Sequence, residues 1–172
     1  LLIDFVPKAI NQALVGDITY VPIGENFAYF APIMDLFSRK IIGWDLSWNP
    51  DRYLTLSALN LAIKLRGEEN LNGCIFHSDH GKQYLCKDHI KKLEGIGMKP
   101  STGEVGNSYD NAYAESLNKT VKYEAVYPYE FDSFEEAYET ISNHVKLYNG
   151  RRLHSGIGYL PPDEFEKKGG IK

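Results

Sequence analysis

The chain has 172 residues, of which 43% are hydrophobic and 13% aromatic, so it can bury a core and is not disordered. No apolar run reaches the roughly 20 residues that cross a bilayer, and we expect a protein without membrane spans. The net charge of −4 is unfavourable for nucleic-acid binding unless some carboxylates carry cations, and only two cysteines, Cys74 and Cys86, favour a reduced, cytoplasmic setting.

The first third of the chain predicts an antiparallel meander. Segments 13–23, 27–37 and 40–48 are rich in β-branched and aromatic residues, and short polar turns separate them. The next segment, which extends to about residue 66, places apolar side chains at helical spacing; Asp51 is a candidate N-cap, and Gly67 ends this helix. Ser133, with Glu136 three residues later, is the N-cap candidate of a later helix.

The remainder alternates short strands with helices. Strands are expected at 73–78 and 98–101, and helices at 87–93, 112–125 and 133–148. A strand–helix–strand step implies parallel pairing through a right-handed crossover. The sequence therefore predicts an α/β fold, in which a mixed five-stranded sheet of three antiparallel and two parallel strands is flanked by helices.

Three acidic residues stand at positions that matter in such a fold. Asp17 lies within the first strand, where an unpaired buried carboxylate is costly unless it has a partner or a metal. Asp79 directly follows the apolar strand at 73–78, and Glu115 lies near the start of a helix. If the first and fourth strands are neighbours, the three carboxylates converge. Such oxygen ligands suit Mg²⁺, and two such ions can promote displacement at a phosphodiester.

Each acid alone is better explained by a structural role, either as a hydrogen-bond acceptor in a strand or as a solvated helix residue. Helix geometry adds one observation, because Glu115, Asn118, Lys119 and Lys122 share one face at offsets of three, four and seven residues. A phosphodiester substrate needs cations beside a metal ligand. An ordinary solvated Glu–Lys pair remains the alternative for this face.

Five segments form a joint pattern that covers about residues 10–166. They are 16–20 (GDITY), 34–44 (MDLFSRKIIGW), 77–84 (HSDHGKQY), 106–116 (GNSYDNAYAES), and Tyr148-Asn149 followed by Arg152, His154 and Pro162. Together these segments resemble the integrase catalytic core family of retroviral integrases and bacterial insertion-sequence transposases, in particular the IS3-like group.

The resemblance implies a ribonuclease H-like fold and a D,D-35-E triad. Residues 80–114, 35 in number, separate Asp79 from Glu115 as that triad requires. By resemblance Asp17, Asp79 and Glu115 are catalytic and bind two Mg²⁺ or Mn²⁺ ions. The implied reaction is cleavage at the end of a mobile element, after which the freed 3′-hydroxyl attacks target DNA.

Further residues are assigned around this triad. The segment 115–119 resembles retroviral integrases, in which lysines that match Lys119 and Lys122 contact the DNA end. The expected DNA-binding set is Lys119, Lys122, Asn118, Arg151 and Arg152. His77 and Asn111 are expected to support the site. For the basic residues after 150, a surface cluster that serves solubility is the alternative.

The resemblance also implies partners: DNA at the element end and at the target, and further copies of the chain on that DNA. Family members carry an N-terminal helix-turn-helix region, which we expect to be missing here, so that residues 1–172 form the core domain alone. The chain departs from many relatives at Leu14, where they carry Trp, and at His80, where they carry Arg. A ribonuclease H-like nuclease that cleaves without joining, and an inactive DNA-binding remnant, are the alternative functions.

Two other groups of residues could suggest metal binding, but we expect neither to bind a metal. Cys74, His77, Cys86 and His89 have a zinc-like spacing, but residues three apart on a strand point to opposite faces, which disfavours a shared ion. Asp35 precedes a predicted turn, and we expect it to accept backbone hydrogen bonds rather than bind metal.

Overall fold

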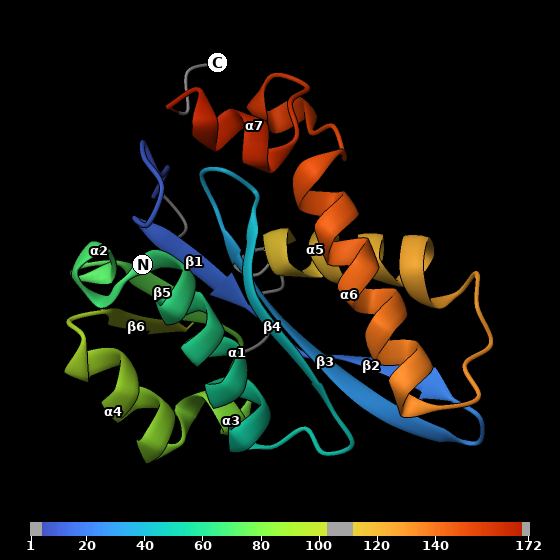
Figure 1. Ribbon diagram of the computed structural model, residues 1–172. Helices are drawn as coiled ribbons and strands as arrows, with labels where there is room; N and C mark the ends of the chain where they lie inside the picture. Colours follow the sequence, from blue (N-terminus) through green and yellow to red (C-terminus); the bar gives the residue numbers. More distant parts are fainter. Residues whose placement is uncertain (1–4, 103–111, 170–172) are drawn as a thin grey trace.

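The computed structural model describes residues 5–102 and 112–169, which fold as a sheet between two groups of helices (Figure 1). The strands are β1 (Ala13–Gly16), β2 (Thr19–Ile23), β3 (Asn26–Asp35), β4 (Ile41–Ser47), β5 (Ile75–Ser78) and β6 (Lys99–Thr102). The α-helices are α1 (Arg52–Arg66), α2 (Glu68–Leu71), α3 (Lys82–Leu85), α4 (Lys87–Gly95), α5 (Ala112–Val121), α6 (Phe134–Gly150) and α7 (Pro162–Lys167). A π-helical turn, η2 (Lys122–Val126), continues α5, and a 3-10 turn, η3 (Ser155–Ile157), precedes α7.

The sheet is mixed, as predicted. Strand β3 pairs antiparallel with β4 along one edge and with β1 and β2 along the other, while β1, β5 and β6 pair in parallel. Six strands replace the predicted five because the segment 13–23 is interrupted. Gly16 pairs with Ile33 and Thr19 with Phe30 in one register, so β1 and β2 are two halves of the predicted first strand.

The interruption falls at Asp17 and Ile18. The Asp17 side chain accepts the Ile18 backbone N–H at 2.9 Å. A side chain that takes a main-chain donor competes with the strand ladder. Asp17 therefore lies in a break of the strand, at the point where β1 ends, rather than in the middle of a regular strand.

Alternating side chains of the strands enter two separate cores. Leu14 joins the core covered by α1 and α4, whereas its neighbours Ala13 and Val15 join the core covered by α5 and α6. This two-residue period is that of a strand buried on both faces. Figure 1 shows the two helix groups on opposite sides of the sheet. Within the described residues, no helix combines the length and the apolar character that a membrane span requires.

Helix α1 packs very closely on β4. A Cβ atom added at Gly43 would lie 2.3 Å from the carbonyl oxygen of Ala58 and 2.8 Å from the backbone nitrogen of Ala62. The absence of a side chain at Gly43 thus sets the distance between helix and sheet.

The predicted caps are confirmed at two helices. The Asp51 side chain accepts the N–H groups of Tyr53 and Leu54 at the start of α1, and Ser133 accepts the N–H of Glu136 at the start of α6. The helix predicted at 112–125 is α-helical only to Val121 and then forms the π-helical turn. The helix α7 was not predicted.

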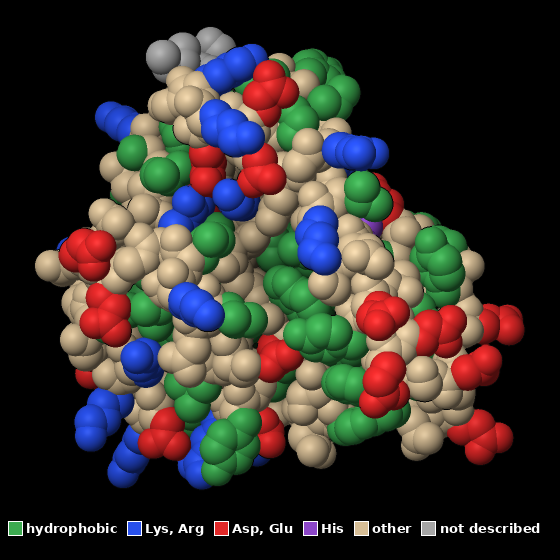
Figure 2. Space-filling model, in the orientation of Figure 1, with side chains coloured by type: hydrophobic (Ala, Val, Ile, Leu, Met, Phe, Trp, Pro, Cys, Tyr) green, Lys and Arg blue, Asp and Glu red, His purple; other side chains and the backbone are tan. Residues whose placement is uncertain are grey.

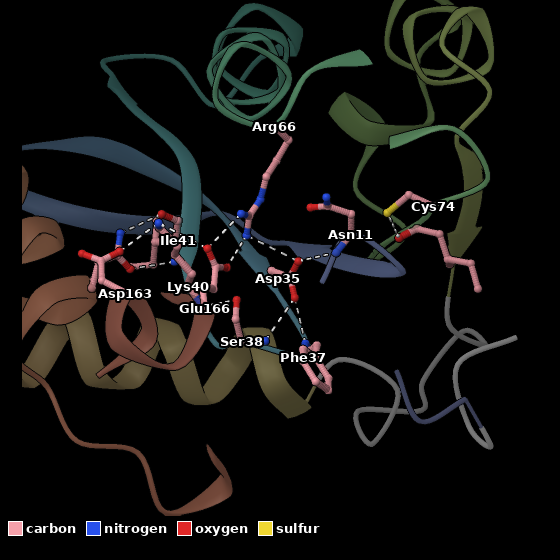
Figure 3. Close-up of polar contacts among 12 residues, drawn as sticks. Asn11, Asp35, Phe37, Ser38, Lys40, Ile41, Arg66, Cys74, Asp163 and Glu166 are labelled. Carbon is pink, nitrogen blue, oxygen red and sulfur yellow. Dashed lines mark hydrogen bonds and ion pairs between the residues drawn. The ribbon is translucent and has the colours of Figure 1, made fainter. Parts of the chain in front are cut away.

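Asp35 is fully buried where β3 ends, and its side chain accepts backbone hydrogen bonds, as predicted (Figure 3). Its carboxylate accepts the N–H groups of Asn11, Phe37 and Ser38 at 2.7, 2.9 and 3.2 Å. Burial raises the pKa of Asp35, while these bonds and the charge of Arg66 act in the opposite direction. Asp35 thus shapes the turn between β3 and β4.

Helix α7 is attached to this turn by ion pairs (Figure 3). Both terminal nitrogens of Arg66 bond the Glu166 carboxylate, and one of them lies 3.6 Å from Asp35. Lys40 pairs with Asp163 at 2.8 Å. The end of the described chain is therefore tied to the end of α1 and to the β3–β4 turn.

Candidate active site

Asp17 and Asp79 directly follow two neighbouring parallel strands. Gly16 of β1 pairs with Ser78 of β5, so the next residue on each strand is one of these aspartates. Adjacent strands lie about 4.8 Å apart. The expectation that the first and fourth strands are neighbours is confirmed, and both acids lie at the edge of the sheet where the strands end.

Helix α5 carries its polar face to the same place. A cavity of about 280 Å³ is lined by Asp17 together with Glu115, Asn118, Lys119 and Lys122. The predicted helix face is thus one surface in the structure, and that surface includes Asp17. Glu115 and Lys119 are exposed, whereas Asn118 is buried.

The electrostatic environment of Asp17 connects all three acids. The pKa of its carboxyl is raised to about 6, chiefly by burial and in addition by the negative charges of Asp79 and Glu115. Two hydrogen bonds counteract this, from the Ile18 N–H at 2.9 Å and from the Asn118 side-chain amide at 2.8 Å. Asp17 therefore lies within the electrostatic reach of both other carboxylates.

Tyr84 packs beneath the two aspartates, a feature that the sequence analysis missed. Its side chain is buried, and its hydroxyl has no hydrogen-bond partner among the described residues. Burial raises the Tyr84 pKa well above its usual value, and the charges of Asp17 and Asp79 add to this effect. A Cβ atom at Gly16 would lie 2.9 Å from the Phe76 ring and 3.4 Å from the Tyr84 hydroxyl, so the absence of a side chain at Gly16 mainly makes room for Phe76.

The donor set suits a hard divalent cation. In the described part of the chain, no three His, Cys, Asp or Glu side chains already stand close enough to hold a metal ion. Asp79 instead accepts the Gly81 N–H at 3.0 Å. All three donors are nonetheless carboxylate oxygens, and a cation bound between them would relieve the repulsion that raises the pKa of Asp17.

Only some of the residues predicted to bind DNA line the cavity that contains Asp17. Lys119 and Lys122 line the acid cavity, and the Lys122 ammonium lies 3.7 Å from the centroid of the Tyr20 ring. Asn118 is only 7% exposed, and its amide is engaged with Asp17. Arg152 lines a different cavity.

Arg152 pairs with Glu124 at 2.9 Å, and Arg151 is exposed and does not line the acid cavity.

Of the two supporting residues, His77 is buried within β5, and its Nδ1 lies 3.1 Å from Ser101 Oγ. Asn111 lies outside the described residues.

Of the residues with zinc-like spacing, Cys74, His77 and His89 are buried, and Cys86 is partly exposed. Cys74 is buried in the core beside α1, and burial raises its pKa to about 12. The buried His89 ring lies 5.4 Å from both the Phe76 and the Tyr84 rings, and burial lowers its pKa to about 4.

Comparisons with known proteins agree with this architecture. One model of the integrase core domain family matches residues 7–108, and a second matches residues 96–162. The chain is 36% identical over 165 residues to the transposase of insertion sequence element IS904 from Lactococcus lactis, and covers 64% of it. It is also 36% identical over 164 residues to the IS629 transposase of Shigella sonnei, and covers 54% of that protein. These matches span 95% of this chain. The chain covers less than two thirds of the length of either relative.

Among solved structures, the HTLV-2 integrase catalytic core domain in complex with magnesium, in a trimeric form, has a similar fold. The TM-score is 0.60 at 18% identity, over 88% of this chain and 95% of that one. This likeness confirms the ribonuclease H-like fold. With the matching family models and transposase relatives, it shows that the chain belongs to the integrase core domain family.

Proposed function

We propose that the chain is the catalytic core of a transposase that cuts and joins DNA phosphodiesters with Asp17, Asp79 and Glu115. The observation that carries the proposal is the environment of Asp17. Its carboxyl is largely buried at the edge where β1 and β5 end, and its pKa is raised to about 6 within the fields of the other two acids. Acids gathered at a strand end, at a cost in electrostatic energy, are typical of catalytic sites.

Asp17, Asp79 and Glu115 would hold two divalent cations, Mg²⁺ or Mn²⁺. The magnesium bound in the HTLV-2 core supports this choice, as does the all-oxygen donor set. When bound, such ions promote deprotonation of the attacking hydroxyl and stabilise negative charge on the leaving oxygen. The chain's own part is to orient the ligands: Asn118 and the Ile18 N–H hold Asp17, and the Gly81 N–H holds Asp79.

In the cleavage step, a water oxygen forms a bond to phosphorus and the P–O3′ bond breaks, which leaves a 3′-hydroxyl. In the joining step, that hydroxyl forms a new P–O bond in target DNA, and the displaced 3′ oxygen leaves. No electron acceptor is needed. Lys119 and Lys122, on the same helix face as Glu115, would bind phosphate groups next to the reacting one.

Charge elsewhere on the molecule restricts where DNA can lie. Exposed acids gather before and along the first turns of α6, at the lower right of Figure 2. They are Glu130, Asp132, Glu135, Glu136 and Glu139. DNA is repelled from that surface. We therefore place the DNA over the lysine-bearing face of α5, and we propose that further copies of the chain assemble on it, as the trimeric form of the HTLV-2 core suggests.

A joining assay tests the proposal. The donor is a labelled duplex with a free 3′-hydroxyl, the target is a supercoiled plasmid, and the reaction contains Mn²⁺. We expect Asp79→Asn and Glu115→Gln each to reduce joined product by at least about 1,000-fold, because each removes a metal ligand. Asp88→Asn is the control, since Asp88 is an exposed acid that pairs with the exposed Arg52 at 3.1 Å and does not line the acid cavity. Plasmid nicking without joined product would instead identify a nuclease, and unchanged activity in Asp79→Asn would refute the site.

A further inference from the structure

A second cavity, of about 610 Å³, lies on another face of α5 and has no part in the proposed chemistry. Tyr113, Ser116 and Thr120 line it, whereas Glu115, Asn118 and Lys119 line the acid cavity. The remaining walls come from the β3–β4 turn, with Arg39, and from the segment after α6, with Tyr159. Its volume lies within the roughly 300–1,000 Å³ typical of ligand sites.

Two side chains of this cavity are held by an unusual backbone. Arg39 and Tyr159 have φ angles of 64° and 57°, in the left-handed region that glycine prefers. Asn11 is the third non-glycine residue with positive φ in the described part of the chain, and it does not line this cavity. Strained backbone conformations of this kind cluster at functional positions, where the role of the side chain outweighs the conformational energy that the backbone requires.

Arg39 brings to the cavity a positive charge that has no ion-pair partner among the described residues. Its guanidinium lies 4.1 Å from the centroid of the Tyr113 ring, and one terminal nitrogen is buried without a hydrogen-bond partner among residues 5–102 and 112–169. Arg152 is neutralised by Glu124 at 2.9 Å. Burial lowers the His154 pKa to about 4, so this residue is neutral at pH 7. An anion entering the cavity therefore meets the charge of Arg39, and guanidinium groups suit phosphate oxygens.

The cavity also offers an aromatic surface for a flat ligand. Tyr159 is 70% exposed, although aromatic side chains favour burial. Its position at the cavity wall leaves the ring available to a bound molecule. The cavity thus combines an arginine with an exposed aromatic ring, which suits single-stranded nucleic acid, with one contact for the backbone and one for a base.

We propose that this cavity binds one unpaired nucleotide of a DNA strand, with its phosphate on Arg39 and its base stacked on Tyr159. The proposal rests on the proposed function for the identity of the nucleic acid. The unpaired nucleotide would belong to the strand that leaves the reacting duplex, on the side of α5 away from Asp17. The cavity thus makes a strand end with an overhang a better ligand than a blunt duplex.

The test is fluorescence anisotropy with a labelled single-stranded oligonucleotide and with the blunt duplex of the same sequence, both in EDTA so that no metal chemistry contributes. Arg39→Gly and Tyr159→Gly remove the side chains while relieving the backbone strain, so both variants are expected to fold at least as stably as the parent chain. We expect each to weaken binding of the single strand by about tenfold and binding of the duplex by much less.

The salt dependence separates the two contacts. Arg39→Gly should reduce the slope of log affinity against log salt by about 0.7, the value for one lost phosphate contact on a single strand, and Tyr159→Gly should leave the slope unchanged. Asn11→Gly is the matched control, because it relieves the same strain outside the cavity. Because the assay contains no metal, its result is independent of whether Asp79→Asn abolishes joining.

Three outcomes would overturn the proposal. The first is that the parent chain does not prefer the single strand over the blunt duplex. The second is that Arg39→Gly binds the single strand with unchanged affinity and salt slope. The third is that the glycine variants differ from the parent chain in molecular mass by light scattering but bind DNA as the parent does. That outcome would assign the cavity to a contact between proteins.

Discussion

The side-chain amide of Asn118 donates a 2.8 Å hydrogen bond to the carboxylate of Asp17, across 101 positions of sequence. The bond connects α5 to the end of β1 and is made by a side chain that is only 7% exposed. It stabilises the ionised form of Asp17, whose pKa burial otherwise raises. Asn118 is thus placed to position Asp17, the proposed metal ligand, rather than to contact solvent.

Removal of this bond should impair the site without removing a ligand. Asn118→Ala is expected to reduce the joining rate by about 10- to 100-fold, the usual effect of losing a residue that orients a metal ligand. It should also raise the pKa of Asp17 above about 6, because the lost bond had lowered it. Joining rates measured against pH would show both effects. Asn143→Ala, at an exposed position of α6, serves as the control and should change neither.

Asp17 is predicted to reduce stability at neutral pH. Its pKa is about 6 in the folded protein against 3.8 for the unperturbed group, so the folded state binds more protons between these values. Stability should therefore decrease as pH rises from about 4 to about 6, and then stay level. Asp17→Asn removes this cost and should raise the free energy of unfolding at pH 7 by about 1–3 kcal/mol while abolishing activity.

Urea unfolding of both proteins at pH 4 and pH 7 checks this prediction. The difference in stability between them should nearly vanish at pH 4. Addition of Mg²⁺ at pH 7 should stabilise the parent chain and not the variant, because the ion binds the folded state. A variant that is less stable than the parent at pH 7 would contradict the prediction.

The ion pairs that attach α7 should contribute strongly to stability. Arg66→Met leaves Asp35 fully buried without its nearby cation and leaves Glu166 without its bidentate partner. We expect a loss of about 3–5 kcal/mol in the free energy of unfolding. Arg52→Met breaks the exposed pair with Asp88 and should cost far less stability, because solvent screens that pair. Equal effects of the two substitutions would show that the buried ion pairs contribute no more to the free energy of unfolding than an exposed pair does.

The close contact between β4 and α1 gives a further prediction. Gly43→Ala places a Cβ atom 2.3 Å from the Ala58 carbonyl oxygen, so helix and sheet must separate. The expected destabilisation is about 3 kcal/mol, measured by thermal or urea unfolding. Gly95→Ala is the control, since an added Cβ there meets nothing within 4 Å. An unchanged midpoint for Gly43→Ala would show that the contact is not tight in solution.

Local patterns in the sequence were sufficient for the order of the strands and for the helix caps. The runs of β-branched residues predicted the strands, and Asp51 and Ser133 cap helices as expected. Asp79 and Glu115 were recognised through a joint pattern of motifs. The break at Asp17 was missed, because the flanking residues keep strand character and one register with β3.

What the sequence did not predict depends on contacts between distant segments. The pair of Arg66 and Glu166 spans 100 positions, and no local period indicates it. Asn118 was assigned to DNA from its helix face, but its burial against Asp17 becomes visible only once α5 is packed on the sheet. Tyr84 ends the matched segment 77–84 but was given no role, and its place near two aspartates depends on the packing of α3 against the ends of β1 and β5.

Anomalous diffraction from crystals of this chain soaked in Mn²⁺ tests most directly whether the three carboxylates form a metal site. We predict anomalous density between the side chains of Asp17 and Asp79, with the Glu115 carboxylate turned toward it, and no such density in Asp79→Asn crystals. Density located elsewhere in the parent crystals, with Asp17 still bonded only to Asn118 and the Ile18 N–H, would contradict the proposed site.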